Sequence, residues 1–318
     1  MVTFVAGNRY VALDSTEAGF SGSDTPTLAH LPGGGFVAVW ALGSGLLAQV
    51  YDAYGVAVSD YFIVTAPNET HAGYPSVGIL ASGGFIVTWE SSQADNSGSG
   101  VSARIFDAQG TPLTGVFTAN TTTFAGQQQP NAAGLTGGGF VITWTDQNGD
   151  DSGFGIRAQR FDAGGNKVGT EFNVNTITGG DQLTPHVTGL PNGGYLISWN
   201  NTWYGSPNQP TPPSYSGQFY DAQGQKVGGE VSLVPNDTNG GQFDVELLAS
   251  GKVLVVAPYQ GMLLGQMYNQ DGTKSGGTFQ VDTPSSVPDM MPQIGALPDG
   301  GFVVTWRAVT SDGPNYFQ

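Results

Sequence analysis

The sequence predicts an all-β protein, a six-bladed β-propeller of four-stranded antiparallel blades. One phrase, two glycines followed by an apolar strand, occurs five times, and a degenerate copy runs from Gly251 to Ala257; the six copies are 49 to 58 residues apart. Gly accounts for 50 of the 318 residues and charged residues for only 11%, which is typical of short strands joined by tight turns. No long segment shows the 3.6-residue apolar period of a helix. Because stacked repeats share one core, residues 1–318 are predicted to form a single domain.

The recurring phrase predicts the second strand of each blade. Its Phe, Val and Trp alternate on one face, and its other face is also apolar, which suits a sheet packed on both sides. A Trp that returns once per unit is interpreted as packing between blades. The six copies end at Trp40, Trp89, Trp144, Trp199, Ala257 and Trp306, so the fifth copy lacks the Trp.

Three further strands complete each unit. A Pro-x-Val-x-x-Leu strand such as Pro185–Leu190 precedes the glycines and is predicted to be innermost. A third strand ends in an Asp-Ala-x-Gly turn, as at Asp162–Gly165, where Asp bonds its own backbone and Gly tolerates a positive φ. A fourth strand follows, as in Glu171–Asn175. This order places short turns on one face of the disc and long loops on the other, and we expect any ligand site on the long-loop face.

The two ends of the chain are predicted to share one blade. Gln318 aligns with Gln159 inside a third strand, and residues 8–14 resemble the fourth strand that the last unit lacks. Sharing a blade in this way would close the ring and remove free sheet edges. A stack of sandwiches is the alternative architecture.

Three phrases of the repeat resemble those of a known class of proteins. They are Leu-x-x-Gly-Gly-Phe-Val-Val-Thr-Trp at 297–306, Gln-Arg-Phe-Asp-Ala-x-Gly at 159–165 and Glu-Phe-x-Val-Asn at 171–175. Together they resemble repeats in large secreted bacterial proteins of the hemolysin-type (RTX) calcium-binding class, and the resemblance covers nearly the whole chain. It implies export and a secreted or cell-surface setting on a bacterium, often within adhesin-like or polymer-degrading proteins. The glycine-rich calcium nonapeptide of that class is missing, so the resemblance implies no calcium site.

Composition excludes several kinds of partner and chemistry. The net charge of −16 disfavours nucleic acid and anionic membrane surfaces, whose phosphates need Lys and Arg. No apolar run reaches the roughly 18 residues of a membrane span, so membrane insertion is not expected. Met1–Tyr10 lacks the basic and apolar segments of a standard secretory signal. Cysteine is absent, which removes disulfides, thiolate metal sites and Cys nucleophiles.

One polar segment is a candidate calcium site. It contains Asp146, Asn148, Asp150 and Asp151, and calcium prefers carboxylate and carbonyl oxygens on a flexible loop. The position of its glycine and the lack of a twelfth acidic residue distinguish it from an EF-hand. The alternative is a solvated Asp/Asn/Gly loop without a metal.

The candidate ligand contacts lie on the predicted long-loop face. The longest loop carries Trp203, Tyr204 and Tyr215, whose rings could stack on sugars or could instead pin the loop to the scaffold. We add His71 and Gln128 from connections between blades, and Arg307 after the last Trp. The sequence favours a structural role for His30 and His186, which lie in or beside innermost strands, and for Gln127 and Gln182, which repeat at equivalent positions.

These features favour a binding module over an enzyme. The predicted function is recognition of a carbohydrate or surface polymer by a monomeric domain of a larger secreted protein. No Ser elbow, His-Glu-x-x-His helix or phosphate loop occurs. The first alternative is a polysaccharide hydrolase or lyase that uses Tyr, His71, Arg307 or carboxylates of the long-loop face. The second alternative, a structural spacer in an adhesin, is disfavoured because the loops differ strongly in length between units.

Overall fold

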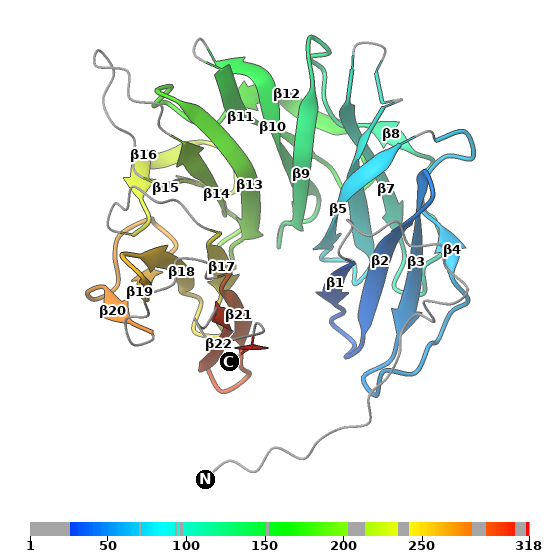
Figure 1. Cartoon of the computed structure of the whole chain (residues 1–318). Helices are drawn as coiled ribbons and strands as arrows, with labels where there is room; N and C mark the ends of the chain where they lie inside the picture. The colour runs from blue at the N-terminus through cyan, green and yellow to red at the C-terminus, as the bar shows by residue number, and fades with distance from the viewer. Residues whose placement is uncertain are drawn as a thin grey trace.

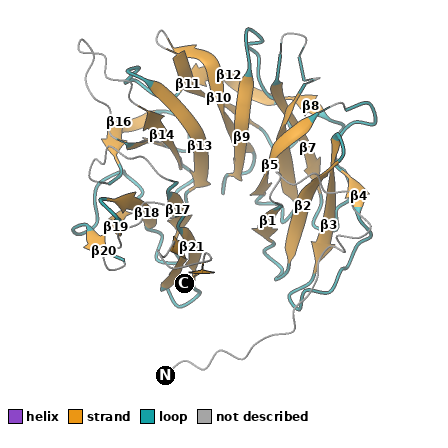
Figure 2. Cartoon of the chain, viewed as in Figure 1, coloured by secondary structure: helices purple, strands orange, loops and turns teal. Residues whose placement is uncertain are grey.

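The fold is known from a computed structural model of the chain. It describes residues 26–69, 71–92, 94–95, 98–150, 153–202, 214–234, 242–281, 291–308 and 316–317. All regular elements in these ranges are β-strands, which confirms the predicted all-β class (Figure 2). These ranges contain no helix that is long and apolar enough to span a membrane.

Five sheets of four antiparallel strands follow one another along the chain, and we call them blades 1 to 5. Blade 1 contains β1 (Thr27–His30), β2 (Phe36–Leu42), β3 (Gly45–Tyr51) and β4 (Phe62–Ile63). Blade 2 contains β5 (Ala72–Ile79), β6 (Phe85–Ser91), β7 (Gly100–Phe106) and β8 (Phe117–Thr118). Blade 3 contains β9 (Gln127–Gly134), β10 (Phe140–Asp150), β11 (Gly153–Phe161) and β12 (Lys167–Asn173). Blade 4 contains β13 (Asp181–Gly189), β14 (Tyr195–Thr202), β15 (Tyr215–Tyr220) and β16 (Lys226–Ser232). Blade 5 contains β17 (Asp244–Leu247), β18 (Val253–Tyr259), β19 (Met262–Tyr268) and β20 (Phe279–Gln280).

The last unit forms two short sheets in the described residues. β21 (Gln293–Ala296) pairs with β22 (Phe302–Thr305), and β23 (Arg307–Ala308) pairs with β24 (Tyr316–Phe317). β24 therefore takes the place of a third strand, as the alignment of Gln318 predicts. Residues 8–14, the expected fourth strand, lie outside the described residues, so closure of the ring by both termini stays a prediction.

The blades surround a common centre, as in a β-propeller (Figure 1). Each inner strand contacts the inner strand of the next blade, in the order β1, β5, β9, β13, β17, β21. The strand order within every four-stranded sheet runs from this inner strand outward, as the sequence predicts. These contacts between inner strands around one centre argue against the alternative of stacked sandwiches.

Apolar side chains pack between neighbouring blades. Trp89 packs with Val37 and Val39 of blade 1, and Trp199 packs with Val141 and Ile156 of blade 3. Trp89, Trp144 and Trp199 are fully buried, which confirms that the recurring Trp belongs to the core.

Buried amides fix the connections between blades. Gln127 is fully buried; its Oε1 accepts a hydrogen bond from Asn120 Nδ2 at 3.0 Å, and its Nε2 donates to backbone carbonyls. Gln182 and Asn175 repeat this arrangement in the next connection, with a hydrogen bond of 2.9 Å. The predicted structural role of the two Gln residues is confirmed.

Candidate functional site

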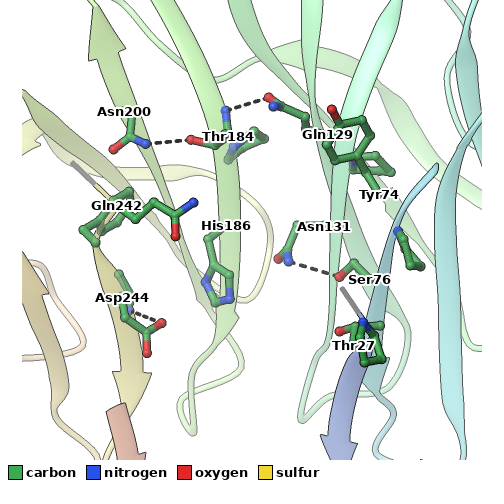
Figure 3. Close-up of a pocket in the computed structure, with 16 residues that line it drawn as sticks. Thr27, Tyr74, Ser76, Gln129, Asn131, Thr184, His186, Asn200, Gln242 and Asp244 are labelled. Atoms are coloured by element: carbon green, nitrogen blue, oxygen red, sulfur yellow. Dashed lines mark hydrogen bonds between the residues drawn. The ribbon is translucent and has the colours of Figure 1, made fainter. Parts of the chain in front are cut away.

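A cavity of about 570 Å³ lies where the inner strands begin, around the centre of the propeller. Its volume is in the range of pockets that hold small molecules. The strands begin on the long-loop face, which is where we expect a ligand site. Figure 3 shows polar side chains from several blades around this space. Five of these residues come directly after the recurring Pro of their unit, or after Phe243, which replaces that Pro in blade 5. They are Thr27, Ser76, Asn131, His186 and Asp244.

The backbone before the Pro is strained in three successive blades. Tyr74, Gln129 and Thr184 line the cavity with φ values of 49°, 51° and 50°. A left-handed conformation is unfavourable for a residue other than glycine, and the following Pro restricts it further. The strand pairing shifts register beside each of the three residues, as at a β-bulge. Strain of this kind is concentrated at functional sites, where the surrounding structure must hold it.

Side chains at the rim connect blades 3 and 4. Gln129 Oε1 accepts hydrogen bonds from Thr184 N at 3.2 Å and from Thr145 Oγ1 at 3.3 Å. Asn200 Nδ2 donates to Thr184 Oγ1 at 2.7 Å (Figure 3). Asn200 Oδ1 is buried and has no hydrogen-bond partner among the described residues.

The residues after the Pro also hold one blade to the next. Asn131 accepts a hydrogen bond from Val187 N at 2.8 Å and donates to Ser76 Oγ at 3.1 Å. Asp244 Oδ2 accepts from Ile294 N at 2.6 Å, so it links blade 5 to β21. These contacts fix the direction of the polar groups around the cavity.

A second cavity of about 280 Å³ lies next to the first along the inner strands, and Glu246 contributes to its wall. The two cavities share Asn131, His186 and Val245. Burial and, to a smaller extent, the negative charge of Asp244 raise the pKa of the Glu246 carboxyl to about 7. The equivalent position in the other units holds Ala29, Gly78, Ala133, Thr188 and Gly295, so blade 5 alone has an ionisable group there.

His186 lines both cavities. Burial lowers the pKa of its imidazole, and the charge of Asp244 opposes this effect. Thr188 Oγ1 lies 3.4 Å from Nδ1. The sequence places His186 in or beside an innermost strand, and the structure has it in β13, where it lines the central cavities.

The predicted ligand contacts lie outside this cavity or are not described. Trp203 and Tyr204 are outside the described residues, and nothing is described of the Arg307 side chain. Gln128 does not line the cavity, whereas its neighbour Gln129 does. His71 is exposed, and its backbone N donates to Glu69 Oε1 at 3.4 Å rather than contributing to the cavity wall.

Tyr215 corrects a further prediction. Its side chain is only 1% exposed, and its ring packs on Phe243 with 5.2 Å between centroids. A buried ring offers no face to a sugar. The alternative, in which this aromatic residue pins its segment to the scaffold, is the one that the structure supports.

The predicted calcium segment forms strands instead of a loop. Asp146 is fully buried, its Oδ2 lies 3.0 Å from Arg157 Nε, and its Oδ1 accepts from Asn148 N at 3.1 Å. Burial raises the pKa of Asp146. Asp150 accepts a hydrogen bond from Asn175 Nδ2 at 3.0 Å. Asp151 lies outside the described residues, in which no group of three or more metal-ligating residues was found, and calcium binding stays a prediction.

Comparison with known proteins supports the fold. No protein family and no curated protein matches the sequence. A protein of unknown function from Dyadobacter fermentans is 11% identical, with 92% of both chains covered and a TM-score of 0.61. The α-L-arabinanase of Penicillium chrysogenum, complexed with arabinobiose, is 15% identical, with 89% of this chain and 87% of that chain covered and a TM-score of 0.59. The α-L-arabinofuranosidase Arb93A from Fusarium graminearum is 15% identical, with 88% and 90% covered and a TM-score of 0.52.

At these identities the likeness concerns the fold alone. None of these comparisons supports the resemblance to RTX repeats. The chain is thus a β-propeller, built from four-stranded antiparallel blades around a polar cavity.

Proposed function

We propose that this chain is a glycoside hydrolase whose substrate enters the cavity at the centre of the propeller. The observation that carries the proposal is Glu246, a carboxyl with a pKa of about 7 in the wall of the second cavity, at a position where the other units have small uncharged residues. Two carboxyl groups with unequal protonation are what glycoside hydrolysis requires. Two proteins of similar fold, an arabinanase and an arabinofuranosidase, support a carbohydrate substrate.

The proposed acid and base lie on one strand. Asp244 and Glu246 are two residues apart on β17, so their side chains share a face and their Cα atoms are about 7 Å apart. In its protonated form, Glu246 gives its proton to the leaving oxygen as the glycosidic C–O bond breaks. Asp244 accepts a proton from the water whose oxygen bonds to the anomeric carbon. His186, uncharged because burial lowers its pKa, offers a hydrogen bond to the sugar beside these groups.

The hydrolase takes precedence over the binding module that composition favours. A module that only holds a glycan needs no pair of carboxyls with one pKa near neutrality. Binding without turnover is therefore an outcome of the test below. A secreted or cell-surface location and calcium binding remain proposals that the hydrolase does not depend on.

We also infer that the ring has six blades, with residues 8–14 as the outer strand of the last one. The first and last sheets support this inference because both leave apolar side chains exposed. Leu28 of β1 is 64% exposed and Val303 of β22 is 48% exposed. Packing of these two sheets against each other would remove both side chains from water.

The test is hydrolysis of a panel of linear arabinan, arabinobiose, xylan and an acidic polysaccharide, followed through new reducing ends and unsaturated products. We expect reducing ends from at least one neutral substrate, and a loss of at least about 100-fold in Glu246→Gln and Asp244→Asn. Asp299→Asn is the matched control because Asp299 is exposed in the turn between β21 and β22, at the other end of the inner strands. Retention of sugar without product would favour the binding module, and unsaturated products would favour a lyase.

A further inference from the structure

Tyr74 differs from the other residues at the cavity mouth. It lines the cavity, yet its side chain is 59% exposed, and it has no hydrogen bond or aromatic contact among the described residues. Large apolar surface exposed on a cavity wall is a common feature of binding sites.

The backbone of Tyr74 has a strained conformation. Tyr74 has a φ of 49° and precedes Pro75. At the equivalent positions, Gln129 and Thr184 take part in the hydrogen bonds that connect blades 3 and 4, so contacts within the protein help to hold them. Tyr74 has no such contact, and its strain therefore lacks a stabilising role in the free protein.

The position of Tyr74 complements the acidic side of the cavity. It comes from blade 2, whereas Asp244 comes from blade 5, and Figure 3 shows the two on opposite sides of the space. An aromatic face attracts the C–H face of a sugar ring, while the amides of Asn131, Asn200 and Gln242 offer hydrogen bonds to its hydroxyls.

We propose that Tyr74 is a specificity-determining platform that stacks on a sugar ring at the mouth of the cavity, one unit away from the bond that is cleaved. The inference rests on the proposed hydrolase and makes it more specific. Since the ring lies across the first cavity from Asp244, the substrate has at least two sugar units. The acidic wall and the net charge of −16 favour a neutral glycan over an acidic one.

The experiment measures binding of arabinobiose, xylobiose and linear arabinan by calorimetry, in a Glu246→Gln background that prevents turnover. Tyr74→Phe keeps the ring and should bind within about twofold of its parent, whereas Tyr74→Ala and Tyr74→Gly should bind on the order of tenfold more weakly. Tyr54→Ala is the matched control because Tyr54 is an exposed Tyr in the Asp52–Gly55 turn, away from the cavity.

A melting curve provides the second measurement. Glycine relieves the positive φ, so Tyr74→Gly should melt above Tyr74→Ala although both bind weakly. If Tyr74→Gly and Tyr74→Ala bind as tightly as the parent while the native chain hydrolyses its substrate, the platform is wrong and the hydrolase stands. If the native chain neither binds nor cleaves any of these sugars, both proposals are wrong.

Discussion

At the scale of single residues, the fifth unit departs from the repeat at three positions, one of which lines the second cavity. Glu246 replaces small residues of the other units, and Phe243 and Ala257 replace the Pro and Trp of the same unit. Burial and the adjacent Asp244 keep the Glu246 carboxyl protonated well above its ordinary pKa of 4.5. A repeat that has a small uncharged residue at a position in five units and an acidic residue in one has placed an ionisable group where packing alone would not.

Glu246 should make stability fall as the pH rises. The unfolded carboxyl ionises near 4.5 and the folded one near 7, so the folded state holds more protons between these values. The contribution is full below pH 4.5 and is lost as the pH rises through 7. The free energy of unfolding of the native chain should fall between pH 4.5 and pH 8, and Glu246→Gln should remove this loss. Denaturant unfolding at the two pH values measures it.

The comparison of the native chain with Glu246→Gln also removes the contribution of His186 to the pH dependence of stability. The pKa of His186 is lowered, so its protonation costs stability at acid pH in both proteins and cancels in the difference. An equal loss of stability from pH 4.5 to pH 8 in the native chain and the variant would contradict the raised pKa. Asp299→Asn should retain the pH dependence of the native chain.

The candidate site could be predicted from the sequence only in part. The cavity lies on the long-loop face, because strand order alone decides which end of the blades carries the long loops. The sequence did not identify the residues that line it, because period-two alternation identifies the face of a strand but not which residues reach the centre of a ring. His186 and Asp244 are 58 residues apart in sequence and come together only through the geometry of successive blades. Asp146 was expected in a loop because its segment is polar, whereas it lies in β10 and pairs with Arg157.

At the scale of elements, the inner strands approach closely through glycine. A Cβ added at Gly134 of β9 would overlap the carbonyl oxygen of Ile79 on β5, and one at Gly189 of β13 would overlap the carbonyl oxygen of Gly134. These overlaps involve backbone atoms, which cannot move aside without shifting a strand. Glycine at this position therefore sets the spacing of blades 2, 3 and 4 around the cavity.

Gly134→Ala should consequently destabilise the protein by about 2–3 kcal/mol, because the strand must shift to accept one methyl group. Gly137→Ala is the matched control: Gly137 lies three residues further on, and an added Cβ there meets no atom within 4 Å. Urea unfolding of both variants measures the difference. Equal midpoints for the two would show that β5 and β9 are not held at the spacing described.

At the scale of the whole molecule, the sequence repeat predicted the fold more completely than it predicted the site. Strand order, inner strand, turn positions and buried Trp residues follow from local patterns that return in every unit, so errors in one unit are corrected by the others. The ends of the array have no such redundancy. The first and last sheets have a neighbour on one side only along the chain, and Figure 1 shows both at the lower end of the view.

Closure of the ring leads to a prediction about truncation. If residues 8–14 complete the last blade, removal of residues 1–25 leaves β24 as an unpaired edge and weakens the packing of β21 and β22. We expect a lower melting temperature, together with faster amide exchange in β21 and β22 than in β9 and β10, which lie in blade 3 away from both ends. The control is the full chain with a Pro at position 3, outside the proposed strand. Unchanged exchange in β21 and β22 after truncation would mean that the terminal segment does not close the ring.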